Sequence, residues 1–332
     1  HGVNVALFSL LTEKSSGIGE FYDLIYLIDW CKDLQLDVIQ LLPLNESGHD
    51  HSPYSALSAY ALHPIYLSLH ALPYIENDSY FREEIKRFAP FCLYKKVPYH
   101  AILNAKMTFL KRYYDIFGAK IKKEKGYDLF LKKHHQWLTE YALFKVLKNQ
   151  YQDILWKSWP IEDRNVSKNH IKGLSKKFHK KMEFHFFLQY LCFSQMKRVK
   201  IYADHAGIFL MGDIPILINS ESHDVWANKD LFNLSMVAGS PPHPLYDPKG
   251  QRWDLPLYRW EVHQQTDYFW WKKRLTIAEE FFHLYRLDHI QGLFRIWAVP
   301  KNGDPSKGEI SYINWIEQIR FEETRNYVQR VL

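Results

Sequence analysis

The chain of 332 residues is long enough to bury a large core, and its 47% hydrophobic and 24% charged residues are ordinary for a globular protein. Its net charge of +6 comes with lysine concentrated in residues 120–135 and 168–181. No zinc-finger spacing, aromatic-basic motif or glycine-rich phosphate loop accompanies these stretches, so we expect solvated helical faces and neither a nucleic-acid nor a membrane partner.

A βαβ unit is predicted at the start of the chain. Residues 3–10 are a short apolar run, SSGIGE at 15–20 is turn-like, and apolar residues recur at helical spacing between 21 and 34. A second apolar run, 37–43, ends at a proline. Strand, turn, helix and strand in this order imply a parallel sheet with helices outside it.

Residues 65–180 form a different region, which is lysine-rich and mostly helical in pattern. Its clearest predicted helix covers 137–147, and a long amphipathic helix, 183–203, follows. We expect 65–180 to be a helical insertion between barrel elements. The chain then divides into first βα units at 1–64, this insertion, and a continuation of the barrel at 181–332.

The βα rhythm returns after the insertion. Residues 206–216, AGIFLMGDIPI, predict a strand, 268–282 a helix and 282–287 the next strand. An apolar run at 294–299 and a helical pattern at 313–331 follow. The sequence therefore predicts four core strands, near residues 3, 37, 207 and 283, whereas a closed (β/α)8 barrel has eight.

The cysteines indicate the compartment. Cys31, Cys92 and Cys192 are widely spaced and form no CxxC pattern, which predicts reduced thiols and a cytoplasmic location. No apolar run reaches the ~18 residues of a membrane span. The chain begins with His1, and residues 3–11 are too short and lack the basic flank of a signal peptide, so we expect an excerpt of a longer sequence.

Two aspartates end predicted strands. Asp213 and Asp288 fall where barrel enzymes place their active groups, at the C-terminal end of a strand. Arg286 is two residues before Asp288, on the same face of the strand, and its charge would keep that carboxyl ionised. An ionised carboxylate suits a nucleophile. The alternative is that one of the aspartates caps the next helix.

The sequence His49-Asp50-His51 has a spacing compatible with a shared metal ion, since alternate residues of an extended segment face the same side. The HExxH and CxxC signatures are absent and Ser-Pro-Tyr follows at once, so we expect no metal. No Gly-x-Ser-x-Gly motif supports a serine hydrolase.

Two stretches combine rings with hydroxyl, amide and guanidinium groups: SPYSALSAYA at 52–61 and GQRWDLPLYRW at 250–260. Such a mixture suits a polyhydroxylated ligand, because rings cover the apolar face of a sugar while polar groups bind its hydroxyls. The alternative for each is a loop packed on the core.

These stretches, in this order, resemble glycoside hydrolase family 77, the 4-α-glucanotransferases also called amylomaltases or disproportionating enzymes. The matching segments are SGIGEFYDL, QLLPLN, DHSPYSALSAYALHPIY, WKSWP, FHFFLQYLCFSQ, MGDIPI, VAGSPP, GQRWDLPLYRW and YRLDHIQGLFRIWAVP. The resemblance implies a (β/α)8 barrel of the α-amylase clan type with a helical insertion, of which this chain holds about the first four strands.

The resemblance also implies site residues and a reaction. Asp288 matches the catalytic nucleophile, Arg286 the arginine that orients it, and His289 a histidine that contacts sugar. Asp213 matches a supporting aspartate, Ser52 and Tyr54 the SPY segment, and Trp253 an aromatic residue that contacts the glucan chain. The implied reaction is retaining transfer of α-1,4-glucan segments between maltodextrins, which needs no metal or organic cofactor.

The chain departs from the family pattern at several positions. The Glu-Asp-Leu-Gly motif that carries the acid/base glutamate does not occur here, and neither Glu309 nor Glu317, Glu322 and Glu323 resembles it. His243, Pro244 and Asp254 also replace residues typical of the family. We therefore expect this chain to be an incomplete barrel that is inactive alone.

Two other functions remain open at this point. A non-catalytic or degenerate α-glucan-binding protein would use the same aromatic stretches. A nucleic-acid binder would use the lysine-rich insertion, and its affinity would fall steeply with salt. The sequence leaves the oligomeric state open.

Overall fold

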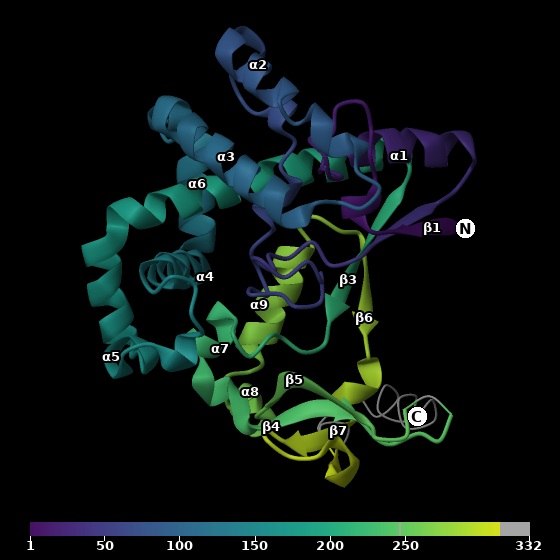
Figure 1. Ribbon diagram of the computed structural model, residues 1–332, viewed down its shortest axis with the longest axis vertical. Helices are drawn as coiled ribbons and strands as arrows, with labels where there is room; N and C mark the ends of the chain where they lie inside the picture. The colour runs from purple at the N-terminus through teal and green to yellow at the C-terminus, as the bar shows by residue number, and fades with distance from the viewer. Residues whose placement is uncertain (246, 313–332) are drawn as a thin grey trace.

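The computed structural model describes residues 1–245 and 247–312 (Figure 1). Two sheets are present among these residues. The first is parallel, in the order β1 (Gly2–Val5), β2 (Val38–Leu41), β3 (Phe209–Pro215) and β6 (Leu284–Asp288). The second is antiparallel, in the order β5 (Gln251–Tyr258), β4 (Phe232–Ser240), β7 (Arg295–Pro300) and β8 (Glu309–Tyr312).

Most of the helices lie between β2 and β3 in the sequence. They are α1 (Asp23–Asp33), α2 (Ser79–Lys86), α3 (Tyr99–Ile121), α4 (Lys125–Gln150), α5 (Ile161–Arg164), α6 (Lys168–Ala206), α7 (His223–Ala227), α8 (Trp260–Gln265) and α9 (Phe269–Ala278). Short 3-10 helices are Leu7–Ser9, Pro64–Tyr66, Leu69–Ala71, Ile75–Asn77, Ala89–Leu93, Trp156–Ser158, Lys229–Leu231, Ile290–Leu293 and Pro305–Lys307. No described helix is both long and apolar enough to cross a membrane.

The parallel sheet confirms the four predicted core strands. β2 lies between β1 and β3, and its Ile39 and Leu41, which share one face of the sheet, are fully buried, while Val38 and Gln40 on the other face are partly buried. Gly212 of β3 allows a close approach to the next βα unit, because a Cβ there would lie 2.4 Å from the Phe282 ring. β3 and β6 pair in parallel with Asp213 beside Arg286.

The helix α6 links the helical region to the barrel strands. It packs on α1 and α4 and ends at Ala206, directly before β3 (Figure 1). The expected domain boundary at residue 180 lies inside this helix. Gly207 takes the left-handed conformation (φ 77°) that ends it.

The antiparallel sheet was not predicted. The interpretation of 250–260 as a loop is wrong for Gln251–Tyr258, which are β5, and the apolar run at 294–299 is β7. Register shifts between β4 and β5 interrupt the alternation that identifies a strand, and Pro256 lies within β5. The predicted helix at 313–331 lies outside the described residues.

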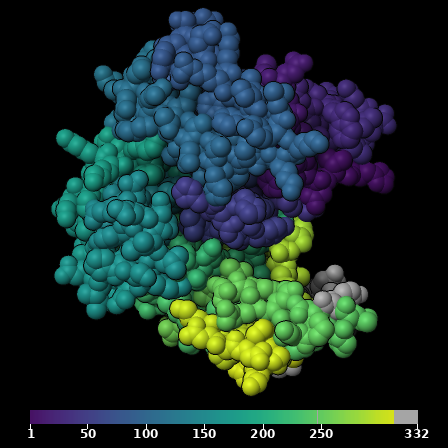
Figure 2. Space-filling model, viewed as in Figure 1, coloured from purple at the N-terminus to yellow at the C-terminus, as the bar shows by residue number. Residues whose placement is uncertain are grey.

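Aromatic residues fill much of the core. Trp137, Trp159 and Trp226 are among the largest fully buried side chains, and they pack with other rings around α4, α6 and α7. In Figure 2 the outline is indented between the N-terminal part in purple and the antiparallel sheet in green and yellow. The C-terminal ends of β3 and β6 point toward that sheet (Figure 1).

Candidate active site

Arg286 joins the two strand-end aspartates. Its Nη1 donates to both carboxylate oxygens of Asp213, at 2.7 and 2.8 Å, and its Nη2 donates to Oδ1 of Asp288 at 2.5 Å. The Asp213 side chain is fully buried, whereas those of Arg286 and Asp288 are 42% and 34% exposed. A buried carboxylate therefore fixes the arginine, and the arginine holds a second carboxylate that solvent can reach.

Tyr54 completes the hydrogen bonding of Asp213. The Tyr54 hydroxyl donates to Oδ2 of Asp213 at 2.7 Å. Burial and this hydrogen bond raise the pKa of the Tyr54 hydroxyl to about 12, so it stays a donor. Hydrogen bonds to Asp213 raise the pKa of Arg286, which keeps the guanidinium charged. Both aspartates thus bind Arg286, and neither caps a helix in the described structure.

His289 and Trp253 form an aromatic corner beside this chain of polar groups. His289 follows β6 with φ of 54°, and its ring meets the Trp253 ring edge-to-face at 5.0 Å and 84°. Burial lowers the pKa of His289, against the opposing effect of Asp288, so a neutral imidazole is favoured. Because Trp253 belongs to β5, the corner is built from both sheets.

Ser52 is not tied to the acidic cluster. Its backbone N–H donates to Oδ1 of Asp50 at 2.8 Å, and its carbonyl accepts from the N–H of Ser55. In the described part of the chain its hydroxyl bonds to neither aspartate. The structure thus brings Tyr54, Asp213, Arg286 and Asp288 into one hydrogen-bonded chain and leaves Ser52 on the same loop without such a bond.

Buried side chains hold the loop that carries Tyr54. Glu46 accepts hydrogen bonds from Tyr141 and Lys145 of α4, and its carbonyl accepts from the N–H of Leu57 at 2.7 Å. Burial alone would raise the pKa of Glu46, but Lys145 and His63 lower it to about 2. Beyond the loop, Oδ2 of the fully buried Asp224 accepts from the N–H of Ala59 at 2.9 Å.

Sequence reasoning missed these supporting residues. One signal was available in α6, where a single glutamine interrupts the apolar run FHFFLQYLCF. This residue, Gln189, is fully buried and exchanges two hydrogen bonds with the backbone of Leu62, at 3.0 and 2.8 Å. Glu46 and Asp224 carry no comparable signal, because their burial depends on contacts between distant segments.

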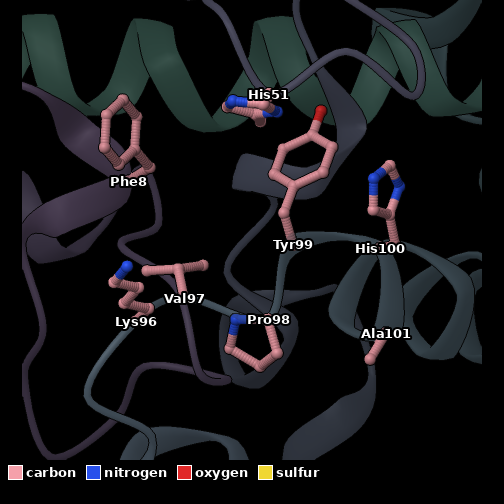
Figure 3. A pocket seen from close by; sticks show the side chains of 8 residues that line it. All are labelled: Phe8, His51, Lys96, Val97, Pro98, Tyr99, His100 and Ala101. Carbon is pink, nitrogen blue, oxygen red and sulfur yellow. The ribbon is translucent and has the colours of Figure 1, made fainter.

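The His49-Asp50-His51 segment forms a different surface. The His49 ring stacks on that of His100 at 6.2 Å, and Nε2 of His49 lies 3.9 Å from the Asp153 carboxylate. Figure 3 shows His51 beside Tyr99 at a pocket of about 660 Å³ whose wall is mostly apolar. Within residues 1–245 and 247–312, no group of three or more His, Cys, Asp or Glu side chains is placed to hold a metal ion.

The chain is similar to known proteins of one family. The model of glycoside hydrolase family 77, described as 4-alpha-glucanotransferase, matches residues 5–329. A 4-alpha-glucanotransferase of Chlamydia caviae is 41% identical over 306 residues, which are 92% of this chain and 57% of that relative. The 4-alpha-glucanotransferase DPE2 of Oryza sativa subsp. japonica is 33% identical over 308 residues, 90% of this chain and 32% of that relative.

Solved structures agree in fold. The amylomaltase of Streptococcus agalactiae in complex with acarbose has a TM-score of 0.83 at 23% identity, over 94% of this chain and 64% of that one. The amylomaltase of Corynebacterium glutamicum has a TM-score of 0.79 at 20% identity, over 94% and 44%. These similarities confirm the predicted α/β fold of barrel type, and the chain spans 57% of the length of the Chlamydia caviae relative. With the family model matched over nearly its whole length, the chain belongs to glycoside hydrolase family 77, the 4-α-glucanotransferases.

Proposed function

We propose that this sequence serves the transfer of α-1,4-glucan segments between maltodextrins, with Asp288 as the nucleophile of a retaining mechanism. The observation that carries the proposal is the Asp213–Arg286–Asp288 chain of hydrogen bonds. Arg286 fixes Oδ1 of Asp288, which leaves Oδ2 to attack the anomeric carbon. Asp213 and Tyr54 hold Arg286 in that orientation.

The reaction proceeds in two displacements. Asp288 forms a bond to the anomeric carbon while the bond to the leaving sugar oxygen breaks, and an acid protonates that oxygen. The 4-hydroxyl of an acceptor sugar then attacks the same carbon, gives its proton to the base, and releases Asp288 as a carboxylate. His289 contacts the donor sugar, and Trp253 contacts the glucan chain. Ser52 contacts the substrate from the loop that it shares with Tyr54.

We propose that none of the described residues of this site is the acid/base carboxyl. A retaining pair of carboxyls lies ~5–5.5 Å apart. The Glu-Asp-Leu-Gly motif is absent from the sequence, and Glu309 lies on β8 of the antiparallel sheet, while Glu317, Glu322 and Glu323 fall outside the described residues. The 332 residues thus provide the nucleophile half of the site and release no glucose from maltotriose alone.

The cellular setting follows from the same sequence features. The substrate is an α-glucan, and no organic cofactor or metal takes part in the displacement. The three cysteines are free thiols, two of them buried, which supports a cytoplasmic location.

A glycosyl fluoride tests the nucleophile without the acid. Fluoride leaves without being protonated, so incubation of the 332-residue chain with α-maltosyl fluoride should produce a covalent maltosyl adduct. Mass spectrometry of proteolytic fragments should place the adduct on Asp288, and the Asp288→Asn variant should form none. A folded chain that forms no adduct, or forms it on another residue, contradicts the assignment.

The same experiment separates the enzyme from a glucan-binding protein. A non-catalytic binder would bind maltotriose, as calorimetric titration would show, and still form no adduct. Adduct formation on Asp288 excludes that alternative, whereas glucose release from maltotriose by the chain alone would contradict the missing acid.

A further inference from the structure

A groove of about 1020 Å³ lies between α3, α4 and α6, in the helical region. In Figure 1 α3 and α4 lie away from β6, and α6 runs from there to β3. None of the described residues that line the groove belongs to the candidate active site. All three helices contribute to the lining, with cationic and aromatic side chains from α3 and α6 and amides from α3 and α4.

The rim of the groove is positively charged. Lys111 and Arg112 come from α3, and Lys180 and Lys181 come from α6, whereas the described lining contains no carboxylate. Lys111 pairs with Asp115 at 2.9 Å, and Arg112 pairs with Glu84 at 3.2 Å, both outside the lining. Among the residues that the structure places, no carboxylate lies within ion-pair distance of Lys180 or Lys181. Lys180 and Lys181 therefore have no carboxylate partner among the described residues, and the Lys181 ammonium lies 5.6 Å from the centre of the Phe178 ring.

The floor of the groove is aromatic. The rings of Tyr114 and Phe184 are half-buried and meet at 5.4 Å with an angle of 62°, so they form a corner. The Lys111 ammonium lies 5.0 Å from the centre of the Tyr114 ring and 5.3 Å from that of Phe184. The corner thus combines an apolar surface with a cation that lies over both rings.

Uncharged polar groups complete the lining. Asn104, Asn149 and Gln150 offer side-chain amides at the exposed edge, each with donors and an acceptor. At the inner end, burial lowers the pKa of His185 to about 3, so its imidazole is neutral. The groove therefore combines cations, ring faces and several neutral hydrogen-bonding groups.

We propose that this groove binds a phosphorylated sugar. Its phosphate is held by Lys180, Lys181 and Arg112, its ring lies on the corner of Tyr114 and Phe184, and its hydroxyls bond to the amides. The tilted pair of rings cannot sandwich a flat base between parallel faces, which favours a sugar over a nucleotide. This assignment is independent of the proposed transferase activity.

Calorimetric titration of the 332-residue chain tests the proposal, with four probes: glucose 6-phosphate, glucose, inorganic phosphate and AMP. Glucose 6-phosphate should bind at one site, at least about tenfold more tightly than each of the other three probes. No saturable binding of glucose 6-phosphate overturns the site. Equal affinity for inorganic phosphate overturns the sugar contact, and tighter binding of AMP overturns the choice of ligand.

Matched variants locate the binding. The double variant Lys180→Ala/Lys181→Ala should weaken glucose 6-phosphate binding by at least about tenfold. The control, Lys172→Ala/Lys176→Ala, removes the same charge from exposed positions of the same helix outside the groove and should leave the affinity within about twofold. Equal weakening by both doubles would indicate non-specific attraction and overturn the proposal.

A third variant distinguishes contact with the sugar ring from charge. Phe184→Leu should weaken binding of glucose 6-phosphate and leave the weak binding of inorganic phosphate unchanged. Thermal unfolding of every variant, compared with the parent chain, verifies that the fold is intact. The Asp288→Asn variant should bind glucose 6-phosphate with the affinity of the parent chain. The test of the groove therefore stands even if the assignment of Asp288 as the nucleophile is wrong.

Discussion

The Tyr54 hydroxyl lies 2.7 Å from Oδ2 of the buried Asp213, although 159 residues separate the two in the chain. Together with the two bonds from Arg286, this contact supplies three hydrogen bonds to one fully buried carboxylate. Because a buried charge is stable only when it is well bonded, each donor supports the orientation of the others.

The Tyr54→Phe variant removes one of these donors and little else. We expect it to lower the free energy of unfolding by about 1–3 kcal/mol, because a hydrogen bond to a buried charged acceptor is lost. Urea denaturation measures the change. Tyr26→Phe, at a position that is 47% exposed, is the control and should change stability by less than about 0.5 kcal/mol. Equal effects of the two variants would contradict the role of the contact.

Arg286→Lys tests the bridge between the aspartates. A lysine ammonium is a point charge without the guanidinium fork, so it cannot bond Asp213 and Asp288 in the same geometry. We expect the rate of adduct formation with α-maltosyl fluoride to fall by about 100-fold. Time-resolved mass spectrometry measures the rate, and a loss of less than about twofold would argue against orientation by Arg286.

Gly212→Ala tests the close packing that positions Asp213. The added methyl would lie 2.4 Å from the Phe282 ring, and overpacking of this kind costs about 1–3 kcal/mol. Gly173→Ala is the matched control, because Gly173 lies in α6 with nothing within 4 Å of the added Cβ, and should stabilise by about 0.5–1 kcal/mol. Phe282→Leu should restore part of the stability that Gly212→Ala removes, and no restoration would contradict the clash.

The buried His63 makes the stability of the fold depend on pH. Its Nδ1 accepts from the Ile65 N–H at 3.2 Å, so Nε2 carries the proton and faces Tyr99 at 2.7 Å. Burial lowers the pKa of His63 from 6.5 to about 4. Between these values the unfolded chain binds a proton that the folded chain does not, so stability is complete above pH 6.5 and falls as the pH drops toward 4.

Denaturation of the parent chain and of His63→Gln at a series of pH values measures this effect. The variant lacks the titrating group, so its free energy of unfolding should fall less steeply as the pH drops. The two slopes should differ by up to about 1.4 kcal/mol per pH unit. Other buried histidines act on both proteins equally and cancel in the comparison. Parallel curves between pH 6.5 and 4 would show that His63 does not titrate in this range.

The parallel strands were predictable because each lies in a short, mostly apolar run, and those of β2, β3 and β6 end in a proline or an aspartate. The same rule predicted Asp213 and Asp288 at one edge, and the register pairs Asp213 with Arg286 and Pro215 with Asp288. The antiparallel sheet was not predictable, since register shifts in β4 and β5 break the alternation on which the rule depends. Its position decides where Trp253 lies, so the aromatic corner could be expected only from the family resemblance.

The contacts within the site also divide into those that the sequence predicts and those that it does not. Arg286 and Asp288 are two residues apart, and their contact follows from strand geometry. The Tyr54–Asp213 contact spans 159 residues and depends on how Glu46 is buried against α4. No local pattern specifies such burial, because the partners Tyr141 and Lys145 become neighbours of Glu46 only after the helices have packed.

The 39-residue helix α6 has a contour length of about 58 Å at 1.5 Å per residue, and two glutamines in its C-terminal half anchor it. Gln189 and Gln195 each exchange two hydrogen bonds with the backbone, at Leu62 and Ser68. His185, one turn before Gln189, lies in the wall of the basic groove. The helix is therefore a strut between the groove and the segment that follows Tyr54: it cannot slide along its axis without breaking amide bonds on the active-site side.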